Sequence, residues 1–249
     1  MKDWQKFLES NQERFEHELL DFVSIPSVSA SSEYVDDVER AARWVSNRLE
    51  KAGAENTVIM PTGGHPVVYG DWLHAGESKP TILIYGHFDV QPAEPFDLWD
   101  TPPFKPEIRN GKVYGRGASD DKGGMLIPII SFEAIKETKG ELPVNVKFLF
   151  EGQEEIGSPE LPEFIAKHRK KFSCDMIFSA DGLQWTEDEP NIVLGLKGLL
   201  GVEIKLTGPK VDQHSGLHGG AIANPLMAVS YTHLRAHETL MNLVCRLLL

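Results

Sequence analysis

The sequence has little cysteine and no long apolar run, and each absence excludes a class of protein. Its 249 residues include only two cysteines, Cys174 and Cys245, which excludes a disulfide framework and a Cys-x-x-Cys metal site. No segment approaches the roughly 20 apolar residues of a membrane span. The N-terminal segment carries charges throughout, so it has no apolar core of a signal peptide. We therefore expect a cytoplasmic protein.

Positive charge is also scarce. The chain has 25 Lys and Arg residues against 37 Asp and Glu residues, which gives a formal net charge of -12. There is no basic stripe that could neutralise phosphates or anionic lipid head groups. We therefore expect neither nucleic acid nor a membrane as a partner. The remaining composition, with 41% hydrophobic residues, is that of an ordinary globular protein.

One apolar stretch ends in two polar residues that could form a functional site. In Thr81–Val90, TILIYGHFDV, a run rich in Ile, Leu and Tyr predicts a buried strand, and Gly86 follows it. His87 and Asp89 then lie on one alternating face, at the strand end where open α/β sheets place their ligand sites. One imidazole nitrogen can bind a metal while a carboxylate fixes the ring through the other nitrogen.

Acidic residues gather at similar positions later in the chain. Asp120 and Asp121, in GRGASDDKGG, precede a predicted helix at 123–138, and Glu154 and Glu155, in EGQEEIG, follow a predicted strand at 144–150. Asp181 follows a predicted strand at 175–179. Buried carboxylates without counter-charge are costly, so acidic groups at neighbouring strand ends imply a cation between them. The simplest such cation is a metal ion.

The order of the predicted elements indicates the fold class. Strands and helices alternate through most of the chain, including a helix at 159–169, which favours an α/β fold with a mostly parallel sheet covered by helices. Apolar periodicity predicts one helix at 4–23 and another that begins near Val35 and ends at Gly53. From Ile192 onward, alternation at Val202 and Ile204 favours the antiparallel strands of a second unit.

Four motifs in order resemble a known family. GHFDV, GRGASDDKGG, EGQEEIGS and DQHSGLHGG are similar to those of the two-zinc amidohydrolases and metallopeptidases, which include acetylornithine deacetylase, succinyl-diaminopimelate desuccinylase, aminoacylase and carnosine-type dipeptidases. The loop AEPFDLWDTPPFKP most resembles the dipeptidase branch. The resemblance implies a zinc-peptidase-like catalytic domain at 1–196 and the start of an α+β lid and dimerisation domain at 197–229.

The resemblance also implies a set of metal ligands. His87 and Asp181 would bind one ion, Asp120 would bridge two ions, and Glu155 would bind the second. The ions would be Zn²⁺, two per subunit, with Mn²⁺ or Co²⁺ as alternatives for mixed His and carboxylate ligands.

Three further residues would take part in catalysis by the same resemblance. Glu154 would act as general base, and Asp89 would orient the metal-binding histidine. His214 would reach the active site of a partner subunit and stabilise the transition state, so a homodimer is implied. The implied reaction is metal-dependent hydrolysis of the peptide bond of dipeptides or short peptides. An N-acyl-amino-acid deacylase and a non-catalytic metal-binding fragment remain as alternatives.

The sequence departs from the family near its end. The family pattern continues with the rest of the lid and a final histidine ligand for the second metal, whereas residues 230–249 do not follow it. We therefore expect a C-terminally truncated chain with an incomplete catalytic domain, uncovered apolar surface and weak or absent activity.

Overall fold

The computed structural model describes residues 2–182, 186, 189, 191–195, 197–198, 200 and 205–227. It divides into two compact units, Met1–Asn191 and Ile192–Leu249. The predicted strand residues Val202 and Ile204, and the segment 230–249, lie outside the described residues. The assignment of the second unit to a lid domain therefore stays a prediction.

A five-stranded sheet forms the centre of the first unit, in the order β1-β2-β6-β3-β7. The strands are β1 (Glu55–Met60), β2 (Val67–Trp72), β3 (Thr81–His87), β6 (Asn145–Glu151) and β7 (Met176–Ser179). β3 pairs in parallel with β6 and β7, while β2 is antiparallel to β1 and to β6. Within this sheet β2 alone runs opposite to the other strands, so the predicted α/β class with a mostly parallel sheet is confirmed.

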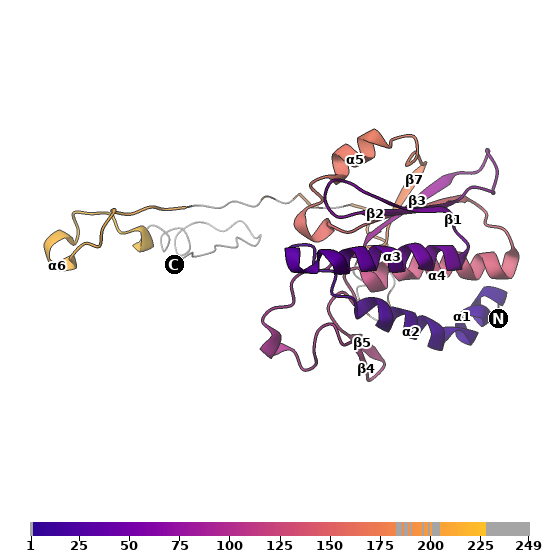
Figure 1. Cartoon of the computed structure of the whole chain (residues 1–249), viewed down its shortest axis with the longest axis horizontal. Coiled ribbons are helices and arrows are strands. Elements are labelled where there is room, and N and C mark those ends of the chain that lie inside the picture. The colour runs from indigo at the N-terminus through magenta and orange to yellow at the C-terminus, as the bar shows by residue number, and fades with distance from the viewer. Residues whose placement is uncertain are drawn as a thin grey trace. The chain divides into compact units, whose positions relative to one another are not determined.

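Helices cover both faces of this sheet (Figure 1). One face is covered by α3 (Val35–Ala52) and α4 (Lys122–Lys139), with α1 (Asp3–Ser10) and α2 (Gln12–Val23) beyond them, and the other by α5 (Leu161–Lys167).

The core follows the alternation of side chains along the strands. Ile84, Phe148 and Phe150 belong to the apolar cluster shared with α3 and α4, whereas Leu83 and Leu149 belong to the cluster shared with α5. The strands at the centre of the sheet are therefore buried on both faces, as expected of parallel strands.

The N-terminal helix differs from its prediction. The single helix predicted at 4–23 is two helices, because Asn11 ends α1 and precedes α2. The Asn11 side-chain amide donates to the carbonyl of Phe7 at 2.8 Å, a local bond that competes with continuation of the helix. By contrast, α3 ends where predicted, at Gly53 with a φ of 88°.

Short elements complete the described chain. They are the 3-10 helices η1 (Ser32–Tyr34), η2 (Phe96–Leu98) and η3 (Glu154–Ile156), the hairpin of β4 (Glu107–Arg109) and β5 (Lys112–Tyr114), and α6 (Ser215–His218) in the second unit. None of the helices in the described part of the chain is long and apolar enough to cross a membrane.

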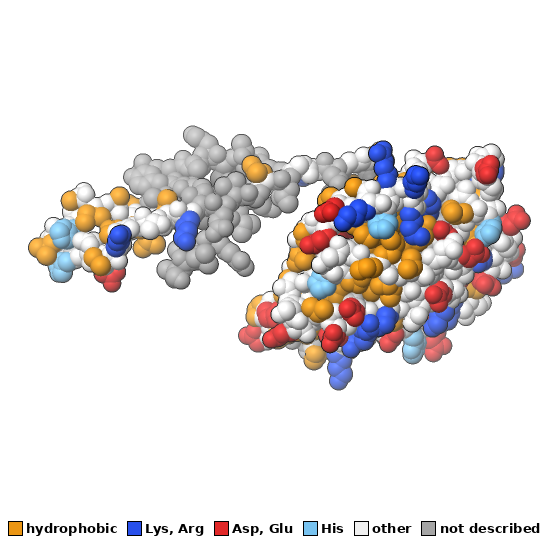
Figure 2. Space-filling view, turned by 45° about the horizontal axis from the view of Figure 1, so that its top comes forward, with side chains coloured by type: hydrophobic (Ala, Val, Ile, Leu, Met, Phe, Trp, Pro, Cys, Tyr) orange, Lys and Arg blue, Asp and Glu red, His pale blue; other side chains and the backbone are white. Residues whose placement is uncertain are grey.

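The edge strand β7 exposes apolar side chains. Met176, Ile177 and Phe178 are more than half exposed, with relative accessibilities of 56%, 65% and 52%. Hydrophobic side chains also gather on the face of the first unit that Figure 2 shows. Uncovered apolar surface was expected from the sequence and is present on this strand.

Candidate metal centre

Three parallel strands end at the same edge of the sheet and bring polar residues together there. His87 ends β3 and pairs in register with Glu151, which ends β6, while Asp181 follows β7. Gly86 allows the Asp121 carboxylate to approach the backbone of β3, because a Cβ atom at position 86 would lie only 2.7 Å from Asp121 Oδ2. That oxygen accepts a hydrogen bond from the His87 backbone amide at 3.2 Å.

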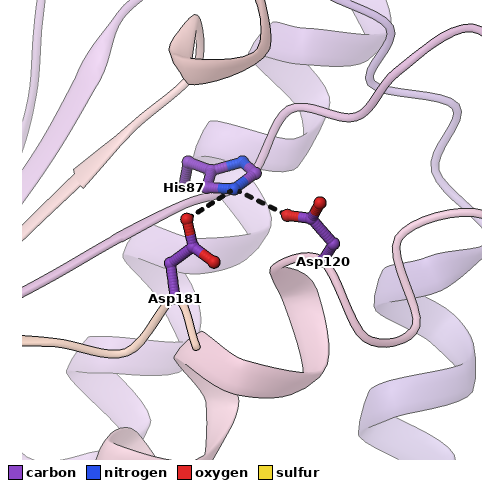
Figure 3. A group of neighbouring side chains, drawn as sticks. All are labelled: His87, Asp120 and Asp181. Carbon is purple, nitrogen blue, oxygen red and sulfur yellow. Dashed lines mark hydrogen bonds and ion pairs between the residues drawn. The ribbon is translucent and has the colours of Figure 1, made fainter. Parts of the chain in front are cut away.

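His87, Asp120 and Asp181 form the candidate metal site. Their ligand atoms all lie within 4.8 Å of one another. His87 Nε2 is 3.1 Å from Asp120 Oδ1 and 3.8 Å from Asp181 Oδ2, and Figure 3 shows both carboxylates directed at this ring. Asp120 lies just before α4, and its peptide bond to Asp121 is cis. Three of the four predicted ligands are thus brought together.

Glu154 approaches the same nitrogen, with its Oε2 3.9 Å from His87 Nε2. Its backbone amide donates to Asp89 Oδ1 at 3.1 Å, and the amide of Glu155 donates to Asp89 Oδ2 at 3.1 Å. Asp89, which is fully buried, thereby fixes the turn that carries both glutamates. It also contacts His87 Nδ1, through its carbonyl oxygen at 3.1 Å and its Oδ1 at 3.4 Å.

The side chain of Glu155, the fourth predicted ligand, is hydrogen-bonded to Gln91. Gln91 Nε2 donates to Glu155 Oε2 at 2.8 Å. Within the described part of the chain, the group of side chains that could hold an ion is His87, Asp120 and Asp181, and Glu155 is not a member of it.

The electrostatics of the site show an excess of carboxylates. Burial lowers the pKa of His87, but the contact with Asp89 and the charges of Asp121 and Glu154 outweigh burial and raise this pKa to about 10. Burial raises the pKa of Asp121 to about 7 against the lowering effect of His87, and the charges of Asp181 and Asp120 raise it further. Burial raises the pKa of Glu154, the charge of His87 lowers it, and repulsion from Glu155 and Asp181 raises it further.

A divalent cation fits this donor set. One buried imidazole nitrogen at the end of β3 lies close to two exposed carboxylates, one just before α4 and one after β7, and mixed nitrogen and oxygen donors suit zinc. A bound cation would also relieve the repulsion among the carboxylates around His87. The donor set and the crowding of carboxylates therefore favour a bound divalent cation at this edge of the sheet.

His214 belongs to the second unit, where it precedes the short helix α6. Its Nδ1 accepts a hydrogen bond from the amide of Gly216 at 3.0 Å. Its predicted catalytic role is not tested by this local geometry and stays a prediction.

Two buried residues beside the site were not singled out from the sequence. Glu151 accepts hydrogen bonds at Oε1 from Tyr85 at 2.6 Å and Ser158 at 2.9 Å. Lys122 is fully buried and donates to the carbonyls of Phe22 at 3.0 Å and Ile25 at 2.6 Å, which ties the start of α4 to the end of α2. The position of Glu151 at the end of a predicted strand was a usable signal, whereas nothing in the sequence indicated the contacts of Lys122.

Comparison with known proteins places the chain in a family. The sequence pattern of peptidase family M20/M25/M40 matches residues 83–242. The Cys-Gly metallodipeptidase dug1 of Schizosaccharomyces pombe is 35% identical over 235 residues, which are 88% of this chain and 48% of that protein. The human Beta-Ala-His dipeptidase is 32% identical over 235 residues, which are 89% of this chain and 46% of that protein.

A solved structure agrees with these sequence relatives. The di-peptidase Dug1p of Saccharomyces cerevisiae superposes with a TM-score of 0.68 at 30% identity, over 92% of this chain and 51% of that one. The chain thus spans about half the length of the curated relatives it matches. The predicted resemblance to the dipeptidase branch is confirmed, and the chain belongs to peptidase family M20/M25/M40.

Proposed function

We propose that the protein hydrolyses the peptide bond of dipeptides or short peptides with a water molecule activated by divalent metal ions. One observation carries the proposal. His87, Asp120 and Asp181 converge at the carboxyl ends of parallel strands, in a chain whose sequence relatives include a Cys-Gly and a Beta-Ala-His dipeptidase.

The ligands proposed for the first ion are supported by this geometry, and those proposed for the second ion by the resemblance of the motifs to the family. His87, Asp120 and Asp181 would hold the first ion, and Asp120 and Glu155 would supply ligands for the second. We propose zinc as the metal, with manganese or cobalt as alternatives, because the donors are an imidazole nitrogen and carboxylate oxygens. Bound ions of this kind supply Lewis acidity, which activates water and polarises the carbonyl of the scissile bond.

Glu154 is proposed as the general base. Its Oε2 lies 3.9 Å from His87 Nε2 and so faces the same space as the ligand oxygens. Burial raises its pKa, which favours proton transfer near neutral pH because the best catalytic base has a pKa near the working pH. Glu154 Oε2 would take the proton of the attacking water and pass it to the leaving amine. Asp89 would support this step by fixing the Glu154 backbone.

His214 is proposed to stabilise the transition state in the site of a partner subunit, which makes the protein a homodimer. This proposal is supported by the resemblance of DQHSGLHGG to the family motif. Its local hydrogen bond to Gly216 holds the imidazole at the start of α6.

A substrate panel combined with one substitution tests the proposed function. Purified protein with added zinc would be assayed on Cys-Gly, β-Ala-His and other dipeptides, and in parallel on N-acetyl and N-succinyl amino acids. We expect hydrolysis of dipeptides. Glu154→Gln should lower the turnover rate by about 10² to 10⁴ with unchanged metal content, since a general base contributes roughly that factor. Glu163→Gln, on exposed α5 surface, is the matched control.

The other outcomes separate the alternatives. Hydrolysis of N-acyl amino acids alone would contradict the dipeptidase and support a deacylase. Bound metal without turnover of either substrate class would support a non-catalytic metal-binding protein. Turnover that survives in Glu154→Gln would remove Glu154 from the role of base.

A further inference from the structure

Gln91 makes an unusual pair of contacts with one predicted metal ligand. Its side-chain Nε2 donates both to Glu155 Oε2 at 2.8 Å and to the Glu155 carbonyl oxygen at 3.0 Å. One amide group therefore binds the side chain and the main chain of the same glutamate, 64 positions away in the sequence.

The backbone that carries Gln91 is anchored from several sides. The preceding Val90 is fully buried, its amide donates to the Ser27 carbonyl at 2.9 Å, and it forms an isolated parallel bridge with Val28. The amide of Phe88 donates to the Glu151 carbonyl at 2.8 Å. Gln91 itself is exposed, so its side chain extends from a fixed backbone and is ordered by Glu155 rather than by packing.

Glu155 is held by the same short segment at a second point. Its backbone amide donates to Asp89 Oδ2 at 3.1 Å, two residues before Gln91. The segment that follows the metal-binding His87 thus fixes the Glu155 amide, carbonyl and carboxylate. Because Gln91 occupies Oε2, the carboxylate keeps Oε1 for another partner.

We propose that Gln91 is a positioning residue for the second metal ion, which orients the Glu155 carboxylate so that its free oxygen faces the ion. The inference rests on the proposed two-ion site. Hydrogen bonds to metal-binding carboxylates orient the ligand, and their removal typically weakens metal binding by about 10- to 100-fold. Gln91 contacts neither His87 nor Asp181 in the hydrogen bonds of the described chain, so the effect belongs to the second ion.

Cobalt titration of the metal-free protein tests this role. Co²⁺ uptake would be followed by visible absorption and by calorimetry in the wild type and in Gln91→Met, which keeps the length of the side chain and removes its donor. We expect the first ion to bind with unchanged affinity and the second to bind at least about 10-fold more weakly. The absorption band of the second ion should also change, which a loss of general stability would not produce.

Gln12→Met is the matched control. Gln12 is also exposed, and its Nε2 donates to a glutamate carboxylate, Glu16 Oε1, at 2.8 Å on α2. This variant should bind both ions as the wild type does. The affinity of Gln91→Met for the first ion reports in the same titration whether that variant is folded.

The remaining outcomes overturn the inference in distinguishable ways. A Gln91→Met protein that binds both ions with wild-type affinity and spectrum would contradict the role of Gln91 and leave the two-ion site intact. Tighter binding of the second ion would mean that Gln91 withholds Glu155 from the metal. Uptake of one ion alone by the wild type would overturn the two-ion site and the role of Gln91 together.

Discussion

The carboxylate of Asp89 accepts a hydrogen bond from the backbone amide of Glu154 at 3.1 Å, although 65 positions separate the two residues. Oδ2 of the same carboxylate accepts a hydrogen bond from the backbone amide of Glu155. Oδ1 of Asp89 also lies 3.4 Å from His87 Nδ1. A single buried carboxylate therefore connects the end of β3 to the turn that follows β6. The positions of the histidine and of both glutamates are thereby coupled.

Replacing Asp89 should disturb metal binding more than it disturbs the fold. In Asp89→Asn, one backbone amide would face a side-chain NH₂ group instead of an acceptor, so the glutamate turn should shift. We expect metal affinity to fall by about 10- to 100-fold, measured by competition with a chromogenic chelator.

A second buried aspartate provides the control for this prediction. Asp71 accepts hydrogen bonds from Tyr69 at 2.6 Å and Asn56 at 2.8 Å, all within β1 and β2. Asp71→Asn should leave metal affinity unchanged. Equal affinities of Asp89→Asn and the wild type would show that the Asp89 carboxylate does not position the site.

Metal removal should lower the thermal stability of the wild type. Ligand binding to the native state alone stabilises it, by about 2.7 kcal/mol when the free ion is at 100 times its dissociation constant. We therefore expect a higher melting temperature in zinc than in a chelator. His87→Ala should abolish this difference, whereas His74→Ala, an exposed histidine paired with Glu55, should retain it. If zinc raised the melting temperature of His87→Ala as much as that of the wild type, the ion would bind at a site other than His87.

Glu151 should make the stability of the metal-free protein depend on pH. Burial raises the pKa of Glu151 above its ordinary value of 4.5, against the hydrogen bonds from Tyr85 and Ser158 that lower it. A raised pKa in the folded state gives stability that is fully present below the unfolded pKa and is lost as pH rises through the folded pKa.

The comparison with Glu151→Gln isolates that contribution. The glutamine is neutral at every pH and keeps an oxygen for the two donors. The wild-type free energy of unfolding, measured by urea denaturation, should fall relative to that of the variant as pH rises from 4.5 through the raised pKa. A difference that stays constant across this range would contradict a raised pKa at Glu151.

The ion pairs that join α2, α3 and α4 should contribute strongly to stability. Arg48 is 2% exposed and binds Glu18 and Glu133. Glu133→Ala removes one partner of this buried guanidinium, and breaking a buried pair costs about 3 kcal/mol or more. Glu39→Ala removes an exposed pair with Arg43 on α3 and should cost at most about 1 kcal/mol. Equal losses of unfolding free energy in Glu133→Ala and Glu39→Ala, measured by urea denaturation, would contradict a stronger contribution from the buried ion pairs.

Much of the layout of the candidate metal site was predictable because it depends on local patterns. The run before His87 is apolar enough to specify a buried strand, and Gly53 marks the end of α3 by its positive φ. Parallel strands end at one edge of a sheet, so polar residues after β3 and β7 were expected to meet. The side chains of His87 and Asp181 do meet there, with Nε2 and Oδ2 3.8 Å apart.

Other features depend on contacts that no local pattern specifies. The break at Asn11 leaves the apolar periodicity intact, so it is invisible to a periodicity argument. The bond between Gln91 and Glu155 joins residues that only the completed sheet brings together. The bond that Lys122 makes to the end of α2 likewise follows from the packing of two distant helices.

Metal content is the measurement that tests the central claim most directly. Wild-type protein and His87→Ala would be loaded with zinc, dialysed against metal-free buffer and subjected to elemental analysis. The account predicts that the wild type retains bound zinc and that His87→Ala loses the ion held with Asp120 and Asp181. Zinc absent from the wild type, or retained equally by both proteins, would contradict a metal centre at the carboxyl ends of β3 and β7.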